Sequence, residues 1–368
     1  MKVLVTGAAG FIGSKVASEL CSRGNEVVCV DNINEYYDVR LKYGRLRQLG
    51  IGEDMVYLEW YKSYTSTRFP NLRFIRMGID EKEALDNLFD IECFDKVVNL
   101  AAHVGVRHSI DNPYGYMKSN IEGFLNILEA CRYHAVKHLV FASSSSSYGL
   151  NKNIPFTEFD FVQTPVTLYA ASKICDELMA HSYSCLYGIP TTGLRYFTTY
   201  GPWSRPDMAP ILFADAITHN KPIKVFNHGD MYRDFTFIDD IAEGTVKVLD
   251  CPPKPATSDN GVPYRIYNIG CSTPVKLTDF ILTMEAALGK KAKLELLPMQ
   301  PGDLYMTYAD TSRLQKDIGF KPRVKLKEGL RRFADWYMHE WATEKDKSKQ
   351  KTQGVKNKKQ TPYSEMFY

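Results

Sequence analysis

The stretch TGAAGFIG, from Thr6 to Gly13, constrains the fold more than any other part of the chain. It follows the apolar run KVLV and precedes the helical pattern FIGSKVASELCSRG, after which a second apolar run, EVVCVD, begins. Glycines at 7, 10 and 13 allow the backbone to turn tightly from a strand into a helix. A strand, a glycine turn, a helix and a second strand form the unit of a right-handed parallel crossover.

The alternation of short apolar runs and helical patterns continues through NLRFIRMGID, DKVVNLAA, KHLVFASS and IPTTGLRY. Runs such as VVNLAA lack polar alternation, which is typical of strands covered on both faces. We therefore predict an α/β fold with a Rossmann-type doubly wound parallel sheet. The long connection from about residue 34 to 70 is expected to hold its own helix, VRLKYGRLRQL.

After YGPWSRPDM the expected helices and strands become shorter and are separated by prolines. This pattern predicts a smaller α+β lobe that covers the carboxyl ends of the strands, where ligands of such sheets bind. The expected division is a cofactor-binding domain over 1–195, to which a segment of about 235–270 returns. The substrate lobe comprises 196–234 and 271–342, and 343–368 is a tail.

Composition narrows the class of protein. The chain of 368 residues is 44% hydrophobic, enough for a large core, and its net charge of +3 arises from the tail, where seven lysines face three acidic residues. Such a tail is typically disordered, so we expect no nucleic-acid or membrane partner. The eight cysteines show no metal spacing, which predicts buried thiols in a reducing compartment, and the absence of a long apolar run predicts a cytoplasmic protein.

The glycine turn also predicts a cofactor, since the free N–H groups of a helix N-terminus attract a pyrophosphate. Asp31, at the end of EVVCVD, is placed to accept hydrogen bonds from a ribose, and its charge would repel a 2′-phosphate, which favours NAD over NADP. A packing turn without a ligand is the alternative. Asp80 could reach the adenine amine or cap the helix EKEALDNLF. The full predicted cofactor set is Gly7, Gly10, Phe11, Ile12, Gly13, Asp31, Asn32, Ile79, Asp80, Leu100, Ala101, Ala102, Tyr169, Lys173 and Tyr196.

The candidate chemical centre is the pair Tyr169 and Lys173, which stand four residues apart in YAASK. That spacing places them on one helix face, where an ammonium stabilises a phenolate and suits it to act as a general base. Five serines, Ser143 to Ser147, precede the pair. Because the apolar strand HLVF leads into them, they are expected to form a row of hydroxyls beside the cofactor rather than a linker.

These motifs together resemble the extended short-chain dehydrogenases/reductases that act on nucleotide sugars, and among them most closely the UDP-glucuronate 4-epimerases. The resemblance extends from about Lys2 to Tyr337 and is carried by TGAAGFIG, SSSSSYG, YAASK, LRYFTTYGPWSRPDMA, GDMYRDFTFIDDI and MQPGD. It implies that Tyr169 is the catalytic base, that Lys173 holds the nicotinamide ribose, and that Ser144 lies near the 4-oxygen of the sugar.

The resemblance also implies the substrate contacts. Ser145 and Ser146 fall where the hexose binds, Thr198 and Arg205 match positions that bind the C6 carboxylate, and Arg233 and Asp303 match contacts to the UDP phosphates and uridine ribose. An interdomain salt bridge is the alternative for Arg205. Ser147 departs from the family, which usually has valine there.

The predicted activity is NAD-dependent 4-epimerisation of UDP-glucuronate to UDP-galacturonate through a 4-keto intermediate. The alternatives are a UDP-glucose/UDP-galactose 4-epimerase, a UDP-glucuronate decarboxylase and, from another class, a non-enzymatic NAD-binding sensor. Dehydratases of this kind carry Thr-Asp-Glu where this chain has Ser144 to Ser146, which makes dehydration improbable. No histidine shows metal-ligand spacing, so no metal is expected, and the resemblance implies a homodimer.

Overall fold

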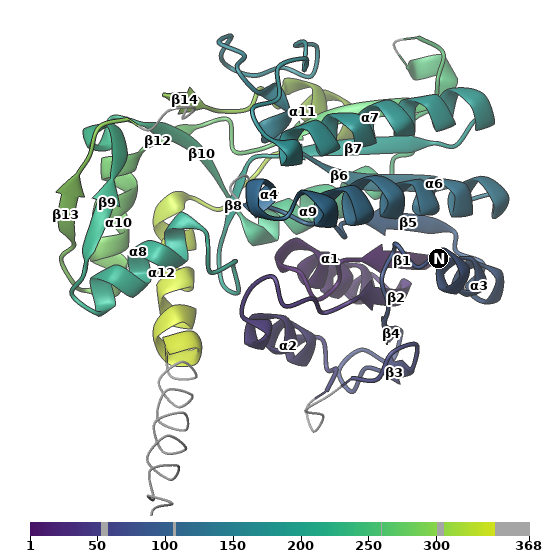
Figure 1. The fold of residues 1–368 in the computed structure, drawn as a ribbon, viewed down its shortest axis with the longest axis horizontal. Coiled ribbons are helices and arrows are strands. Elements are labelled where there is room, and N and C mark those ends of the chain that lie inside the picture. Colours follow the sequence, from purple (N-terminus) through teal and green to yellow (C-terminus); the bar gives the residue numbers. More distant parts are fainter. Residues whose placement is uncertain (53–57, 106–107, 259, 300–304, 343–368) are drawn as a thin grey trace, which may run out of the picture.

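The computed structural model describes residues 1–52, 58–105, 108–258, 260–299 and 305–342. Its centre is an eight-stranded sheet in the order β11-β7-β6-β5-β1-β2-β4-β3, in which every neighbouring pair is parallel except β3 and β4 (Figure 1). The strands are β1 (Lys2–Thr6), β2 (Glu26–Asp31), β3 (Ser63–Thr65), β4 (Leu72–Arg76), β5 (Lys96–Asn99), β6 (His138–Ser144), β7 (Thr191–Tyr196) and β11 (Tyr264–Ile269).

Helices cover both faces of this sheet, which explains why its strands are almost uniformly apolar. One face packs against α1 (Phe11–Ser22), α9 (Ile238–Leu249) and α11 (Ser312–Ile318), and the other against α3 (Lys82–Glu92), α6 (Gly123–Tyr133) and α7 (Leu168–Tyr187). Strand β1 lies between β2, which follows it in the sequence, and β5, which starts the other half of the sheet. The predicted Rossmann-type α/β fold is confirmed, and its topological switch point, where such folds bind ligands, lies between β1 and β5.

The connection between β2 and β3 contains the expected helix, α2 (Val39–Gln48). Its Arg45 is 1% exposed and donates to the carbonyl oxygens of Trp203 and Ala9 at 2.9 and 3.1 Å. A Cβ atom on Gly44 would lie only 2.1 Å from the Trp203 ring. The helix therefore ties the glycine turn after β1 to the segment that leads into the smaller lobe.

The smaller lobe has its own core around the stacked rings of Phe235 and Phe280, whose centroids are 4.2 Å apart. Its elements are β8 (Thr198–Tyr200), α8 (Ala209–Thr218), β9 (Pro222–Val225), β10 (Tyr232–Phe237), β12 (Pro274–Lys276), α10 (Leu277–Leu288), β13 (Lys293–Leu296), β14 (Met306–Thr307) and α12 (Leu326–Trp336). Strand β10 pairs with β8, β12 and β14, and β13 pairs with β9.

The chain passes between the two parts of the fold more often than the predicted boundaries suggest. Residues 235–237 belong to β10 in the smaller lobe, and the return to the large sheet begins with α9 at Ile238. Later, Leu314 of α11 and Phe320 join the core of the large sheet. The predicted tail, 343–368, lies outside the described residues.

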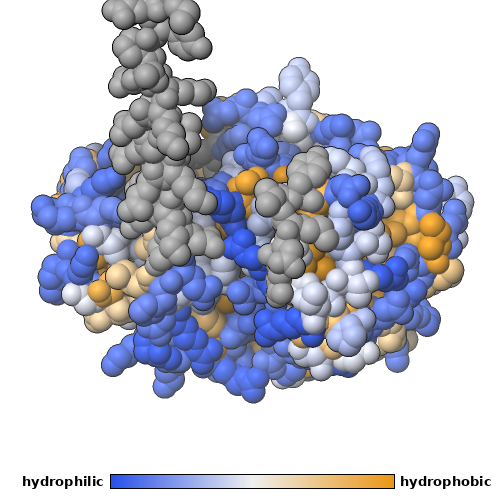
Figure 2. Space-filling view, turned by 90° about the horizontal axis from the view of Figure 1, so that it is seen from below, coloured by the Kyte–Doolittle hydropathy of each residue, from blue (hydrophilic) through white to orange (hydrophobic). Residues whose placement is uncertain are grey.

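The outer surface is largely polar (Figure 2), and it exposes some of the cysteines. The face in Figure 2 is mostly hydrophilic, with smaller hydrophobic patches, and within the described ranges no helix is both long and apolar enough to span a bilayer. Cys21, Cys29 and Cys131 are buried as expected. The expectation is wrong for Cys93, Cys185 and Cys251, which are exposed because they lie at or near the ends of helices.

Candidate active site

The glycine turn between β1 and α1 is shaped by backbone contacts that leave no room for side chains. Gly7 has φ +66°, and a Cβ atom there would lie 2.7 Å from both the Leu100 carbonyl carbon and the Ala101 nitrogen. A Cβ atom on Gly13 would lie 2.1 Å from the Gly7 oxygen. Gly10 precedes α1 without a side-chain cap, and the first turn carries no acidic residue. The N-terminus of α1 is thus suited to an anionic group.

Asp31 lies directly beside this turn. Its carboxylate accepts hydrogen bonds from the backbone nitrogens of Ala9 at 3.1 Å and Ile33 at 2.7 Å, and the Lys42 ammonium is 3.7 Å away. Asn32, the next residue, accepts from the nitrogen of Asn34 at 3.1 Å. The carboxylate therefore stands at the carboxyl end of β2 next to the helix N-terminus, which is the placement that a ribose acceptor requires.

The ends of β4 and β5 complete this side of the site. The Thr6 hydroxyl donates to Asn99 at 2.6 Å and accepts from the Ala101 nitrogen at 3.2 Å, which fixes the path of Leu100, Ala101 and Ala102 along the glycine turn. Ile79 is buried against Gly123. Asp80 pairs with Lys118 at 3.1 Å, and Glu81, not Asp80, is the residue that precedes α3.

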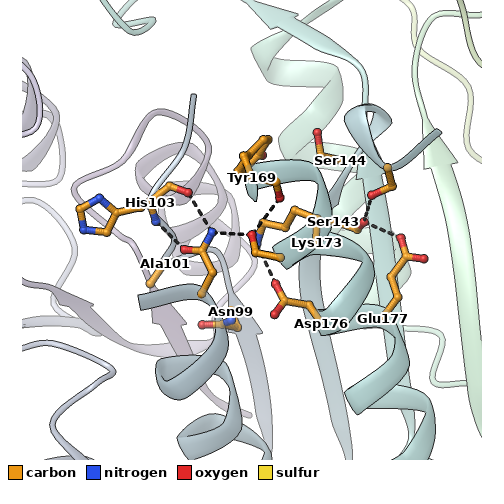
Figure 3. A network of polar contacts seen from close by, with 12 residues as sticks. Asn99, Ala101, His103, Ser143, Ser144, Tyr169, Lys173, Asp176 and Glu177 are labelled. Atoms are coloured by element: carbon orange, nitrogen blue, oxygen red, sulfur yellow. Dashed lines mark hydrogen bonds and ion pairs between the residues drawn. The ribbon is translucent and has the colours of Figure 1, made fainter. Parts of the chain in front are cut away.

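Tyr169 and Lys173 lie on the first turns of α7, whose N-terminus is capped by the Thr167 hydroxyl. Tyr169 is partly exposed, and its ring meets that of Tyr116 edge-on, with 6.1 Å between centroids. Lys173 is 3% exposed and its ammonium donates to Asp176 at 3.0 Å (Figure 3). Burial raises the pKa of the Asp176 carboxyl to about 6, against the opposing charge of Lys173.

The five serines divide into two groups with different surroundings. Ser143 and Ser147 are buried, and the Ser143 hydroxyl donates to Glu177 at 2.5 Å. Ser144, Ser145 and Ser146 are partly exposed, and the Ser146 hydroxyl donates to that of Ser144 at 2.8 Å. In Figure 3 the Ser143 side chain points toward Glu177, whereas the Ser144 side chain points away from it. The second group is therefore the one available to a ligand.

A buried ion pair supports the serine row from beneath. Arg195 of β7 donates to Glu177 of α7 at 2.9 and 2.7 Å and lies 4.8 Å from the centroid of the Tyr148 ring. Burial alone would lower the pKa of the Arg195 guanidinium, but the hydrogen bonds and charge of Glu177 outweigh it and raise the pKa. The pair fixes the carboxyl ends of β6 and β7 against α7.

Arg205 places a positive charge near Tyr169. It donates to Asp207 at 3.0 Å through Nε, and electrostatic interactions link it to the phenols of Tyr36 and Tyr169. Burial acts to lower the pKa of its guanidinium, but Asp207 raises it overall. Gly105 passes close by, since a Cβ there would lie 2.4 Å from the Tyr36 hydroxyl and 3.7 Å from Arg205 Nη2.

The remaining predicted residues lie in or next to the smaller lobe. Thr198 begins β8 and is partly exposed, and Arg233 of β10 donates to the carbonyl oxygen of Tyr232 at 2.8 Å. Tyr196 ends β7, but its hydroxyl is hydrogen-bonded to Thr245 of α9 at 2.9 Å inside the core. Asp303 lies outside the described residues.

Comparison with known proteins identifies the family. The model of the NAD-dependent epimerase/dehydratase family matches residues 3–270. The chain belongs to this family.

Two relatives and one solved structure illustrate the similarity. The chain is 45% identical to protein CapI of Staphylococcus aureus over 347 residues, which cover 92% of this chain and 98% of the relative. It is 41% identical to a probable UDP-glucuronate 4-epimerase of Rhizobium meliloti, over 92% of this chain and 97% of that one. The crystal structure of a UDP-glucuronic acid 4-epimerase from Bacillus cereus, in complex with UDP-glucuronic acid and NAD, matches with a TM-score of 0.78 and 32% identity, over 91% of this chain and 98% of the other.

Several polar residues of this epimerase-family site were not predicted from the sequence. Asn120 exchanges hydrogen bonds with the backbone of His103 at 2.8 and 3.0 Å and donates to Ser172, which in turn donates to the Tyr169 carbonyl oxygen. This chain connects the end of β5 to the first turn of α7. The buried pair of Glu177 and Arg195 was also missed; charged residues beside apolar ones hinted that each is buried, but not that they meet.

The histidine His103 lies close to the site among aromatic side chains. The His103 ring packs 5.7 Å from that of Tyr116, and burial, followed by the charges of His108 and Lys42, lowers its pKa. Across the part of the chain that the structure describes, no three His, Cys, Asp or Glu side chains are grouped to hold a metal ion. Asp239 and Asp240 lie in the first turn of α9, where acidic side chains complement the helix dipole.

Proposed function

We propose that the protein is an NAD-dependent isomerase that converts UDP-glucuronate to UDP-galacturonate by inversion at C4, through a 4-keto intermediate. The observation that carries this proposal is the guanidinium of Arg205, which interacts electrostatically with the Tyr169 phenol. A cation with a planar fork suits a substrate carboxylate and would be left without that partner by a neutral hexose. The similarity to the Rhizobium meliloti and Bacillus cereus proteins, whose names describe them as UDP-glucuronate 4-epimerases, supports the proposal.

The residues around the glycine turn fit the dinucleotide. Side chains at Gly7 and Gly13 would collide with the backbone of the turn. The N-terminus of α1 carries no side-chain cap and no acidic residue that would oppose a pyrophosphate, and Asp31 lies next to it, where a ribose acceptor is needed. When bound, NAD supplies a hydride acceptor that returns the hydride to the opposite face of the sugar. We assign to it Gly7, Gly10, Phe11, Ile12, Gly13, Asp31, Asn32, Ile79, Asp80, Leu100, Ala101, Ala102, Tyr169, Lys173 and Tyr196, as the sequence predicted.

Tyr169 is assigned as the general base that takes the proton of the 4-hydroxyl. Lys173 stabilises the phenolate and holds the nicotinamide ribose, and one of its three N–H groups is already committed to Asp176. Ser144 is assigned to position the 4-oxygen, since it is partly exposed at the carboxyl end of β6 and its hydroxyl accepts from Ser146. Ser145 and Ser146 are assigned to the hexose.

Arg205 and Thr198 are assigned to the C6 carboxylate. The Asp207 carboxylate now occupies the Nε side of Arg205, so a second carboxylate binds by sharing the guanidinium or by displacing Asp207. The 4-keto intermediate is a β-keto acid and loses CO₂ most easily when its C–COO⁻ bond is perpendicular to the ketone plane. A clamp on the carboxylate that prevents this orientation separates an epimerase from a decarboxylase.

The finer assignments complete the proposal. We assign Arg233 and Asp303 to the UDP moiety, and the smaller lobe, 196–234 and 271–342, to the substrate. Strand β10 extends this lobe to Phe237, and Leu314 and Phe320 pack in the core of the large sheet instead. We assign the protein to the cytoplasm. A homodimer is supported by exposed leucines on adjacent helices: Leu178 and Leu186 of α7 are 67% and 68% exposed, and Leu125 of α6 is 38% exposed. Light scattering of the Leu178→Glu protein against the parent tests the dimer.

The proposed activity is tested by incubating the purified protein with UDP-glucuronate and, separately, with UDP-glucose, without added NAD. Proton NMR should show UDP-galacturonate from the first substrate and no turnover of the second. UDP-galactose would favour the neutral-hexose epimerase, and a pentose product would indicate the decarboxylase. Tyr169→Phe is the control for background conversion, and a parent protein as inactive as Tyr169→Phe would favour the sensor.

A further inference from the structure

Asp176 is a buried carboxyl group that the assigned chemistry does not use. It is 2% exposed and lies three residues after Lys173 on α7, so the two side chains share one helix face. Its Oδ2 accepts from the Lys173 ammonium at 3.0 Å. Among the described residues its Oδ1 has no hydrogen-bond partner, although it is shielded from solvent. A buried carboxylate with one oxygen unsatisfied is costly to the fold, which calls for an explanation.

The ion pair of Lys173 and Asp176 also influences the electrostatic potential at Tyr169. Lys173 is 3% exposed, and the Asp176 carboxylate is its one hydrogen-bond partner within the described parts of the chain. A buried ammonium stabilises a phenolate one turn away, whereas a carboxylate on the other side of that ammonium opposes the effect.

Apart from Lys173, the groups around Asp176 are one further carboxylate, which is paired with an arginine, and several uncharged side chains. On its own helix, Glu177 acts on it, and the Cys175 thiol in turn has its pKa raised by burial and by Asp176. Across from α7, β7 contributes Arg195, which is paired with Glu177. The β6 strand and the turn after it, the segment Met117–Glu122 and β11 place the uncharged Ser143, Asn120 and Tyr264 against α7.

We infer that Asp176 is a positioning residue for the reaction: its carboxylate anchors the Lys173 ammonium and limits the positive charge that Lys173 lends to the Tyr169 phenolate. The inference rests on the proposed roles of Tyr169 and Lys173. Burial raises the pKa of Asp176 to about 6, so the carboxylate is ionised at neutral pH and becomes neutral as the medium turns mildly acidic. At low pH the neutral Asp176 no longer offsets the charge of Lys173, so Lys173 stabilises the Tyr169 phenolate more strongly under the conditions in which a base is hardest to keep ionised.

The decisive variant is Asp176→Asn, which keeps the shape and an oxygen acceptor for Lys173 but removes the charge. The acidic limb of the kcat/KM profile for UDP-glucuronate should move to lower pH by about half a unit or more, as expected for a unit charge within about 10 Å in a protein interior. Asp176→Glu, which keeps the charge, should return the limb toward that of the parent. The matched control is Asp240→Asn, since Asp240 of α9 is also a buried carboxylate and accepts from the Val324 nitrogen; this variant should leave the limb in place.

A second measurement does not depend on the substrate. The ultraviolet absorbance of tyrosinate, recorded against pH for each protein and corrected with the corresponding Tyr169→Phe protein, reports the ionisation of Tyr169 alone. In Asp176→Asn it should appear at lower pH than in the parent. If this shift occurs but no UDP-glucuronate is turned over, the inference stands and the proposed substrate is wrong. If Asp176→Asn only lowers the melting temperature, with both pH curves unmoved, Asp176 is merely structural and the inference is overturned.

Discussion

His138, at the first position of β6, provides a prediction whose magnitude follows from its contacts. The side chain is fully buried, its Nδ1 lies 2.9 Å from the Leu249 carbonyl oxygen and its Nε2 lies 2.9 Å from the Thr192 hydroxyl. Because a carbonyl can only accept, Nδ1 carries the proton and Nε2 accepts from Thr192, so the ring is held neutral. Burial lowers its pKa from 6.5 to about 4.

The sign and size of the effect follow from proton linkage. Between about pH 6.5 and pH 4 the unfolded chain binds a proton at His138 that the folded protein excludes. The stabilisation is therefore fully present above about pH 6.5 and is lost as the pH falls through the folded value. A difference of about 2.5 pKa units, at 1.36 kcal/mol each, amounts to about 3 kcal/mol. Asp176 contributes in the opposite direction over part of this range, since its pKa is raised to about 6.

The assay is urea unfolding of the parent and of His138→Gln at a series of pH values, followed by circular dichroism and fluorescence. Glutamine can donate to Leu249 and accept from Thr192 but does not titrate, and the contribution of Asp176 cancels in the comparison. The free energy of unfolding should decline less steeply toward acid in His138→Gln, with the gap between the two proteins changing by about 3 kcal/mol across the window. Parallel curves would refute the argument.

Three further predictions concern the site. Glu177→Gln leaves Arg195 buried without a counter-charge, so the free energy of unfolding should fall by about 3 kcal/mol or more in urea titrations, and an unchanged value would mean that the pair does not support the serine row. Gly13→Ala places a methyl group 2.1 Å from the Gly7 oxygen and should abolish copurification of NAD, whereas Gly24→Asn, at an open left-handed position, should retain it; equal NAD content in both would contradict the role of the turn. Arg205→Lys keeps the charge but loses the fork, and kcat/KM for UDP-glucuronate should fall about 10- to 100-fold; a parental value would exclude Arg205 from the carboxylate site.

The sequence could predict those features that depend on local pattern. The glycine turn, the apolar strands and the position of Asp31 at the end of β2 are set by residues within one crossover unit, so motif and order sufficed. The helix α2 also followed from the unusual length of the connection that contains it. The large-sheet fold could be inferred from the repetition of these units.

Other features depend on contacts between distant segments and were out of reach. Nothing local indicates that Glu177 of α7 meets Arg195 of β7, because that contact requires the helix to pack on the sheet in a particular register. The same holds for Leu314 and Phe320, which leave the smaller lobe to join the large core. The division of the serine row became clear only with Ser143 seen against Glu177.

The central claim is that C4 of the sugar is oxidised and reduced again within one closed site. The most direct test uses UDP-glucuronate carrying deuterium at C4, incubated with the purified protein in ordinary water. The account predicts UDP-galacturonate that retains the deuterium at C4, as observed by NMR and mass spectrometry. Replacement of the label by solvent hydrogen, or inversion that proceeds undiminished in Tyr169→Phe, would contradict it.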